Sequence, residues 1–60
     1  MGLMDPVNYR VVRIDGDYAM LQNESDPDAP LAQVALARLP EEITDGSRVQ
    51  RVMLDYTLLQ

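Results

Sequence analysis

The sequence predicts a small all-β fold, a four- to five-stranded barrel or meander. The pattern of strand and turn signals along the chain leads to this prediction. Runs rich in β-branched residues are separated by sharp turn signals, above all the Asp-Gly pairs at positions 15–16 and 45–46. The chain of 60 residues also contains no Cys and no His. Small folds usually offset a limited core with disulfides, metals or oligomerisation, so self-association is the expected route to stability.

The start of the chain predicts a short tail. Asp5-Pro6 breaks regular structure, and the folded part is expected to begin just after it. We therefore expect positions 1–7 to form a flexible N-terminal tail and positions 8–60 to form a single small β domain. No internal repeat or low-complexity tract divides the chain further.

Asp15 and Gly16 predict a β-hairpin. They stand between two β-prone runs, and both residues tolerate the positive φ that a type I′ turn requires. If they form the loop alone, Ile14 lies opposite Asp17. If the loop takes three residues with Gly16 in a bulge, Ile14 lies opposite Tyr18, and the apolar pairing improves. Either register leaves apolar side chains on both faces, which suits a closed barrel or a sheet covered by a partner.

The middle of the chain predicts a loop, a strand and one helical turn. Positions 23–30 hold two prolines among acidic and small residues, which is typical of a solvated loop. The segment 31–39 fits neither the helix nor the strand period cleanly, so both remain open. We favour a strand over about 34–36. One short helical turn is expected near residues 39–43, because Pro followed by two acids is typical of a first helical turn.

The last third of the chain predicts the remaining strands. Asp45 and Gly46 mark a second sharp turn, the run 47–54 follows it, and positions 56–59 are again β-prone. The whole pattern gives four or five strands with short connections, as in SH3-like or OB-like barrels.

Composition and charge narrow the class of partner. A chain with 47% hydrophobic and 25% charged residues is too apolar to be intrinsically disordered. Ten Asp and Glu against five Arg give a net charge of -5, which disfavours binding to nucleic acid and to anionic membranes. No apolar run approaches the ~20 residues that span a bilayer, and no secretion signal is visible. We therefore expect a cytoplasmic protein, and acidity of this degree is common among bacterial ones.

Few residue types are available for catalysis. The absence of His, Cys and Lys removes the usual general base, thiol nucleophile, Schiff-base amine and soft metal ligands. Asp15 and Asp17 flank a hairpin glycine, so turn formation explains them better than a carboxylate pair does. The helix dipole explains Glu41 and Glu42. We expect no enzymatic activity, and the sequence identifies no cofactor, metal or small-molecule ligand.

The arginines and tyrosines raise the alternative of a nucleic-acid-binding barrel. Arg side chains near both ends of the domain and three Tyr rings could supply charge and stacking. Because strand neighbours alternate, however, Arg10 and Arg13 point to opposite faces of an unbulged strand. Pairing of each Arg with an acid across the sheet is therefore favoured. A third reading, an acidic antagonist of a nucleic-acid-binding protein, requires one clustered acidic face.

Apolar residues exceed what one small barrel readily buries. The surplus comprises Met20, Leu21, Val52, Met53, Leu54, Leu58 and Leu59. We take Met20, Met53, Leu58 and Leu59 as the candidate interface, since Met-containing patches adapt to partners. The predicted function is that of a non-enzymatic protein-interaction or accessory module, a homo-oligomer or a binder of another protein.

The chain also resembles a family of short bacterial proteins, the domain of unknown function three-thousand-and-six. The resemblance rests on the stretch 13–21 (Arg-Ile-Asp-Gly-Asp-Tyr-Ala-Met-Leu), on Leu-Pro at 39–40 and on Asp-Gly at 45–46, and it covers about residues 9–54. It departs from the family at Val12, where many relatives carry an acid, and it lacks their charged C-terminal extension. The resemblance implies a small β fold and no established activity.

Overall fold

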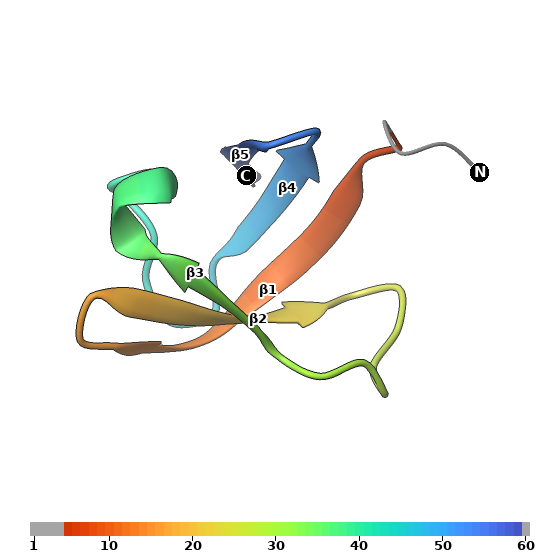
Figure 1. Cartoon of the computed structure of the whole chain (residues 1–60), viewed down its shortest axis with the longest axis horizontal. Helices are drawn as coiled ribbons and strands as arrows, with labels where there is room; N and C mark the ends of the chain where they lie inside the picture. The colour runs from red at the N-terminus through yellow and green to blue at the C-terminus, as the bar shows by residue number, and fades with distance from the viewer. Residues whose placement is uncertain (1–4, 60) are drawn as a thin grey trace.

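The structure is all-β. The computed structural model describes residues 5–59, and its five antiparallel strands form one sheet that curls into a half-barrel (Figure 1). The strands are β1 (Val7–Asp15), β2 (Tyr18–Asn23), β3 (Ala32–Ala35), β4 (Arg48–Val52) and β5 (Asp55–Leu59). The only helical element within 5–59 is a 3₁₀ turn, η1 (Leu36–Arg38).

The predicted tail 1–7 and the predicted domain 8–60 each extend beyond the described residues. Of the predicted tail 1–7, positions 1–4 lie outside the described residues, and β1 already begins at Val7. Gln60 also lies outside them. No helix in the described part of the chain is long and apolar enough to cross a membrane.

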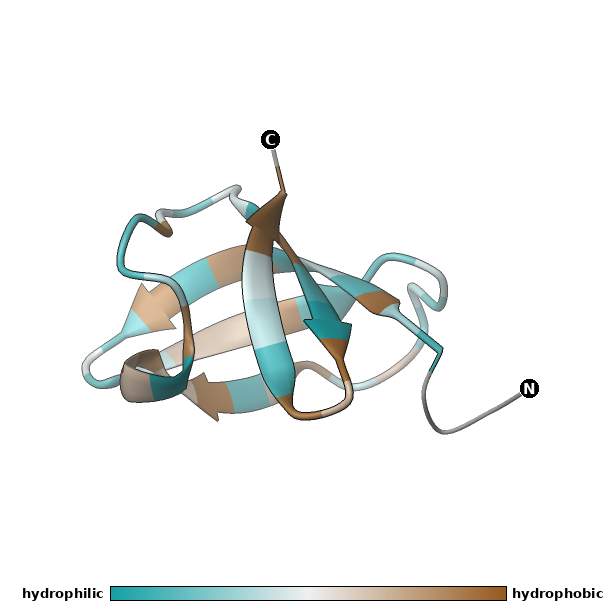
Figure 2. Ribbon diagram, turned by 90° about the horizontal axis from the view of Figure 1, so that it is seen from above, coloured by the Kyte–Doolittle hydropathy of each residue, from teal (hydrophilic) through white to brown (hydrophobic). Residues whose placement is uncertain are grey.

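Strand β1 is the centre of the sheet. The strand order is β3-β2-β1-β4-β5, so the first three strands form a meander in which β2 and β3 lie on one side of β1. The chain then crosses over to add β4 on the other side of β1, followed by β5. Figure 2 shows how the strands wrap around a shared interior. Strands β3 and β5 are the two edges of the sheet.

The core lies on the concave face of the sheet. Its buried side chains are Val11, Ala19, Leu21, Val34, Leu39, Ile43 and Val49. The strand residues among them follow the period-two alternation that sends every second side chain inward. Leu39 and Ile43 come instead from the crossover between η1 and β4, and they pack on the same cluster. The crossover therefore covers part of the interior that an open sheet leaves exposed.

The β1–β2 hairpin has a register that differs from both expectations. Ile14 pairs with Ala19, rather than lying opposite Asp17 or Tyr18. The loop is formed by Gly16 and Asp17, and only Gly16 takes a positive φ, of 62°. The expected type I′ turn needs positive φ at a non-glycine residue as well, whereas the observed loop needs it at glycine alone. This register also brings Ile14 beside a fully buried Ala on the concave face.

A β-bulge at Val12 changes which residues share a face of β1. Arg10 pairs with Gln22, and Arg13 pairs with Met20. Gln22 and Met20 stand two positions apart on β2, so they share a face, and their two Arg partners share that face too. The prediction that Arg10 and Arg13 point to opposite faces assumed a strand without a bulge. Because β1 has a bulge, the two side chains lie on the same face.

The helical turn lies earlier than the predicted 39–43. Strand β3 ends at Ala35 and η1 follows directly, so the ambiguous segment 31–39 is a strand and then a 3₁₀ turn. Leu39 is extended, with φ -113° and ψ 159°, as residues before proline usually are. Pro40 begins a separate single turn, in which the Ile43 N–H donates to the Pro40 carbonyl at 3.4 Å.

The predicted Asp-Gly turn at 45–46 anchors the crossover to β1. Gly46 has a φ of 87°, and its N–H donates to the carbonyl of Val11 at 2.8 Å. The Val11 N–H donates in turn to the carbonyl of Ser47 at 2.8 Å. Within the turn, the hydroxyl of Ser47 accepts from the Thr44 N–H at 2.8 Å. These bonds fix the chain next to the β1 bulge.

Candidate functional site

The four residues predicted as an interface do not form one patch. Leu58 packs against the buried core, and Met20 and Leu59 are half-buried on β2 and β5. Those two strands are separated by β1 and β4, which puts them three strand spacings, roughly 14 Å, apart. Met53 is exposed at the turn between β4 and β5. Of the four, only Met53 is exposed.

The β4–β5 turn is the most exposed apolar segment of the described chain. Val52 is 40% exposed, Met53 56% and Leu54 75%, and the three are consecutive. Figure 2 shows hydrophobic colouring at this turn, away from the core. Val52 and Leu54 were missed as interface candidates, although the run Val-Met-Leu without Gly, Asn or Pro before Asp55 was a visible signal, because hairpin loops normally use those turn residues.

Met53 also has an unfavourable backbone conformation. Its φ is 58°, and it is the only non-glycine residue with positive φ among residues 5–59. For an L-residue other than Gly, Asn or Asp, this region costs about 1–2 kcal/mol. Strained residues of this kind are concentrated at functional sites, where the loss of stability is tolerated because the site needs the geometry.

The two edge strands differ in how well they are protected from pairing with another chain. Strand β3 has four residues, Pro30 stands two positions before it, and η1 follows it at once. Short length and nearby proline are common protections of an edge. Strand β5 has five residues without Lys, Pro or a bulge, and its ladder is to β4 alone in the described structure. No other strand of the described chain pairs with the free side of β5.

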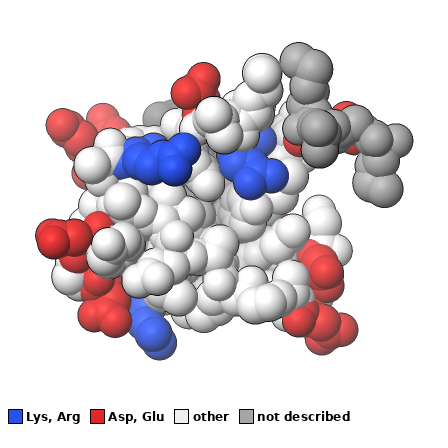
Figure 3. Space-filling model, in the orientation of Figure 1, with Lys and Arg blue, Asp and Glu red and all other residues white. Residues whose placement is uncertain are grey.

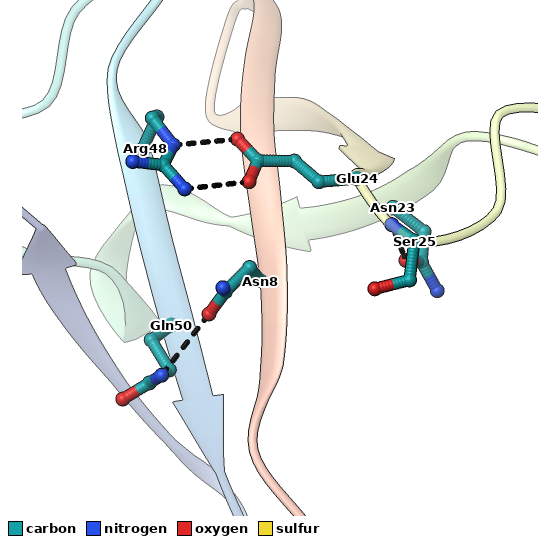
Figure 4. Close-up of polar contacts among 6 residues, drawn as sticks. All are labelled: Asn8, Asn23, Glu24, Ser25, Arg48 and Gln50. Atoms are coloured by element: carbon teal, nitrogen blue, oxygen red, sulfur yellow. Dashed lines mark hydrogen bonds and ion pairs between the residues drawn. The ribbon is translucent and has the colours of Figure 1, made fainter.

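The convex face of the sheet carries three arginines. The bulge aligns Arg10 with Arg13, and Arg10 also pairs with Arg48 on β4. Glu24 lies beside them and accepts two hydrogen bonds from Arg48, of 2.7 Å to Nε and 2.8 Å to Nη2 (Figure 4). Close by, the Gln50 amide donates to Oδ1 of Asn8 at 3.0 Å. Polar pairing across β1 thus occupies much of this face.

The ion pair shifts the pKa values of both Glu24 and Arg48. The hydrogen bond from Arg48 lowers the pKa of Glu24 below its ordinary value of 4.5, against a smaller opposing effect of desolvation, and the charges of Arg48 and Arg10 lower it further. The hydrogen bond and charge of Glu24 raise the pKa of Arg48. Glu24 is therefore ionised over the whole neutral and mildly acid range.

The tyrosines do not assemble into a stacking platform with these arginines. The ring of Tyr9 packs on the core, with the guanidinium carbon of Arg51 at 5.9 Å from its centroid. Tyr56 packs on the core as well. Tyr18 is exposed, and it lies at the hairpin end of β2. Stacking surfaces for bases need several exposed rings along one groove, and the described chain offers one.

An open cleft of about 350 Å³ lies where the β1–β2 hairpin meets the crossover. Its lining is apolar apart from one carboxylate, and it consists of Ile14, Leu36, Ala37, Pro40, Glu41 and Ile43. The Leu36 N–H donates to the Asp17 carbonyl at 2.8 Å, which fixes η1 against the hairpin loop. The sequence places Ile14 in the hairpin and predicts a helical turn around Glu41. It gives no sign of the cleft, because the cleft depends on the tertiary contact between these two segments.

The acidic residues lie in separate groups. Asp26 and Asp28 are on the exposed β2–β3 loop, which Gln22 holds through a hydrogen bond from its side-chain amide to the Asp26 carbonyl at 3.2 Å. In Figure 3, red side chains flank the end of the molecule at which Figure 1 shows η1 and the hairpin, and others lie at the opposite side. Residues 5–59 contain no group of three or more carboxylates, His or Cys arranged to hold a metal ion.

No known protein family, curated protein or solved structure matches the chain. The resemblance to the bacterial family of unknown function stays a prediction. The hairpin tip, the sheet edge, the convex face and the cleft are the features of the described chain that bear on its function.

Proposed function

We propose that the chain is a non-enzymatic, cytoplasmic protein-interaction module that self-associates through the β4–β5 hairpin. The observation that supports it most strongly is the hairpin tip, where three successive apolar residues are 40%, 56% and 75% exposed. A turn built only for solubility uses polar residues and glycine. Here an apolar residue at positive φ holds the tip, at a cost to stability that association can offset.

The free edge of β5 supplies the pairing geometry. A second copy aligned antiparallel about Thr57 places each Tyr56 opposite the partner's Leu58, and each Asp55 opposite the partner's Leu59. The two Asp55 carboxylates then lie four residues apart along the joined strands, roughly 13 Å, so they do not repel each other strongly. The arrangement is self-complementary, as a two-fold dimer requires. It also extends the apolar interior, because Tyr56 and Leu58 both pack on the core.

Met53→Asp tests the tip, because this substitution separates association from folding. Asp tolerates positive φ better than Met, so the variant is expected to fold at least as well. In the pairing about Thr57 the tip lies just past the end of the partner's β5, so loss of its apolar side chain should weaken, rather than abolish, the oligomer seen by light scattering after size exclusion across a concentration series. Leu31→Asp is the matched control, since Leu31 is also exposed but lies on the β2–β3 loop. A wild-type chain that is monomeric at every concentration would rule out this function.

A second candidate, nucleic-acid binding, is favoured by one observation. The bulge at Val12 gathers Arg10, Arg13 and Arg48 on one face. Glu24 opposes it by engaging Arg48, which is why this candidate ranks second. Salt-sensitive retardation of labelled single-stranded RNA that Arg13→Gln reduces would favour it, and no retardation at low salt would eliminate it.

A further inference from the structure

The cleft between the hairpin and the crossover has the composition of a side-chain pocket. Its walls are the apolar groups of Ile14, Leu36, Ala37, Pro40 and Ile43, with Glu41 as the single charged member. Its volume of about 350 Å³ is near the lower end of the roughly 300–1,000 Å³ of ligand pockets. A space of this size suits one or two apolar side chains of a partner better than a large cofactor.

The surroundings of the cleft are acidic. Glu41 is part of the lining and Glu42 follows it, while Asp15 follows Ile14 and Asp17 lies in the hairpin loop, where its carbonyl accepts from the Leu36 N–H. All four carboxylates are exposed. Within residues 36–43, which supply the cleft lining other than Ile14, Arg38 is the only basic residue. Figure 3 shows red side chains around this end of the molecule, with blue side chains among them.

The hairpin and crossover are held in fixed relation, so the cleft is preformed. The Leu36 N–H bonds to the carbonyl of Asp17, and the Leu39 N–H bonds to the carbonyl of Leu36 at 3.0 Å. The adjoining Ile43 is buried in the core and fixes the floor. A preformed site avoids the entropy cost of ordering a loop on binding.

We propose that this cleft binds a short basic-apolar segment of a partner protein, with an aliphatic side chain seated between Ile14 and Ile43 and flanking Lys or Arg residues paired with the acidic rim. Charge complementarity selects this occupant. A second copy of this chain, with a net charge of -5, would bring like charges to the rim. The cleft lies on elements other than β4 and β5, so this binding is independent of the proposed self-association.

A labelled peptide, Lys-Arg-Leu-Leu-Arg-Lys, tests the proposal by fluorescence anisotropy against the full chain at low ionic strength. Two control peptides separate the contributions: one carries Ser in place of both Leu, and the other carries Gln in place of every base. We expect saturable binding of the first peptide only, weakened by added salt. Absence of saturable binding would overturn the proposal. So would binding of either control within about twofold of the test peptide, because charge alone or apolar contact alone would then explain it.

Three variants assign the binding to the cleft. Glu41→Gln removes the lining charge and should weaken the peptide roughly two- to fivefold, as loss of an exposed ion pair does. Ala37→Arg fills the cleft from an exposed position and adds a positive charge that repels the basic peptide. It should therefore weaken binding about tenfold or more. Asp28→Asn, the matched control on the exposed loop at the other end of β2, should leave the affinity unchanged.

The outcomes also separate this proposal from self-association. Met53→Asp should bind the peptide as the wild type does, since the hairpin tip does not line the cleft. Amide shifts in ¹H–¹⁵N spectra should concentrate at Leu36, Ala37 and Ile43. Equal loss of affinity in Ala37→Arg and Asp28→Asn, or shifts confined to β5, would place the peptide elsewhere and refute the cleft as its site.

Discussion

Glu24 and Arg48 join the end of β2 to the start of β4 across the intervening β1. The Arg48 guanidinium donates through Nε at 2.7 Å and Nη2 at 2.8 Å to the two carboxylate oxygens, a bidentate geometry (Figure 4). The two residues are 24 positions apart in sequence. Next to this pair, the Glu24 N–H also bonds to the carbonyl of Asn8 at 3.0 Å. The ion pair thus links the meander to the strands that follow the crossover.

Glu24→Gln is expected to lower stability in a pH-dependent way. The folded-state pKa of Glu24 lies below its ordinary 4.5 because Arg48 stabilises the carboxylate. Its contribution is therefore complete above pH 4.5 and is lost as the pH falls through the lowered folded-state pKa. The difference in Tm between wild type and variant should shrink on acidification over that range. Arg48→Gln should show the same profile, and a Tm difference independent of pH would contradict the electrostatic role.

Gly46→Ala tests the turn that holds the crossover on β1. Nothing lies within 4 Å of a Cβ added at Gly46, so the cost comes from its φ of 87° alone. We expect a loss of about 1–2 kcal/mol in the free energy of unfolding by urea. Gly46→Asn should lose less, because Asn tolerates positive φ. Equal losses for both variants would show that the backbone conformation is not the cause.

Short-range signals were sufficient to predict the all-β class and the approximate positions of the strands. The β-prone runs and the Asp-Gly pairs indicated the all-β class because both depend on a few neighbouring residues. The register of β1 needed more than that. Next to the bulge at Val12, the backbone N–H and carbonyl of Val11 bond to the turn at 46–47. That turn is more than thirty residues away in sequence. Local patterns could not reveal that Arg10 and Arg13 share a face.

The candidate site was predictable only in part, for a similar reason. Met53 and Leu58 were both identified from composition, but the packing of Leu58 against the core follows from the pairing of β4 with β5. The open edge of β5 depends on which strands are neighbours, and the cleft depends on η1 packing against the hairpin loop. Both are tertiary relationships that residue periodicity does not encode.

Met53→Gly is expected to stabilise the monomer while weakening association. Glycine relieves the strain of a φ of 58°, and its greater freedom in the unfolded chain removes part of that gain. The net change should be about 0.5–1 kcal/mol more stable in urea unfolding at low protein concentration. Leu54→Gly is the control, because Leu54 has no positive φ and should lose stability. A Met53→Gly chain less stable than wild type would contradict the strain at this turn.

Thr57 offers the sharpest test of the two-fold pairing of β5. Its side chain is exposed, so a charge there should leave the monomer folded. In the antiparallel dimer each Thr57 lies opposite its own copy. Thr57→Lys and Thr57→Glu should therefore each be monomeric by light scattering, because like charges directly opposite destabilise a strand pair. An equimolar mixture of the two variants should recover a heterodimer through opposite charges at the same position. A mixture that stays monomeric while the wild type dimerises would exclude this register, and variants that dimerise alone would show that association uses another surface.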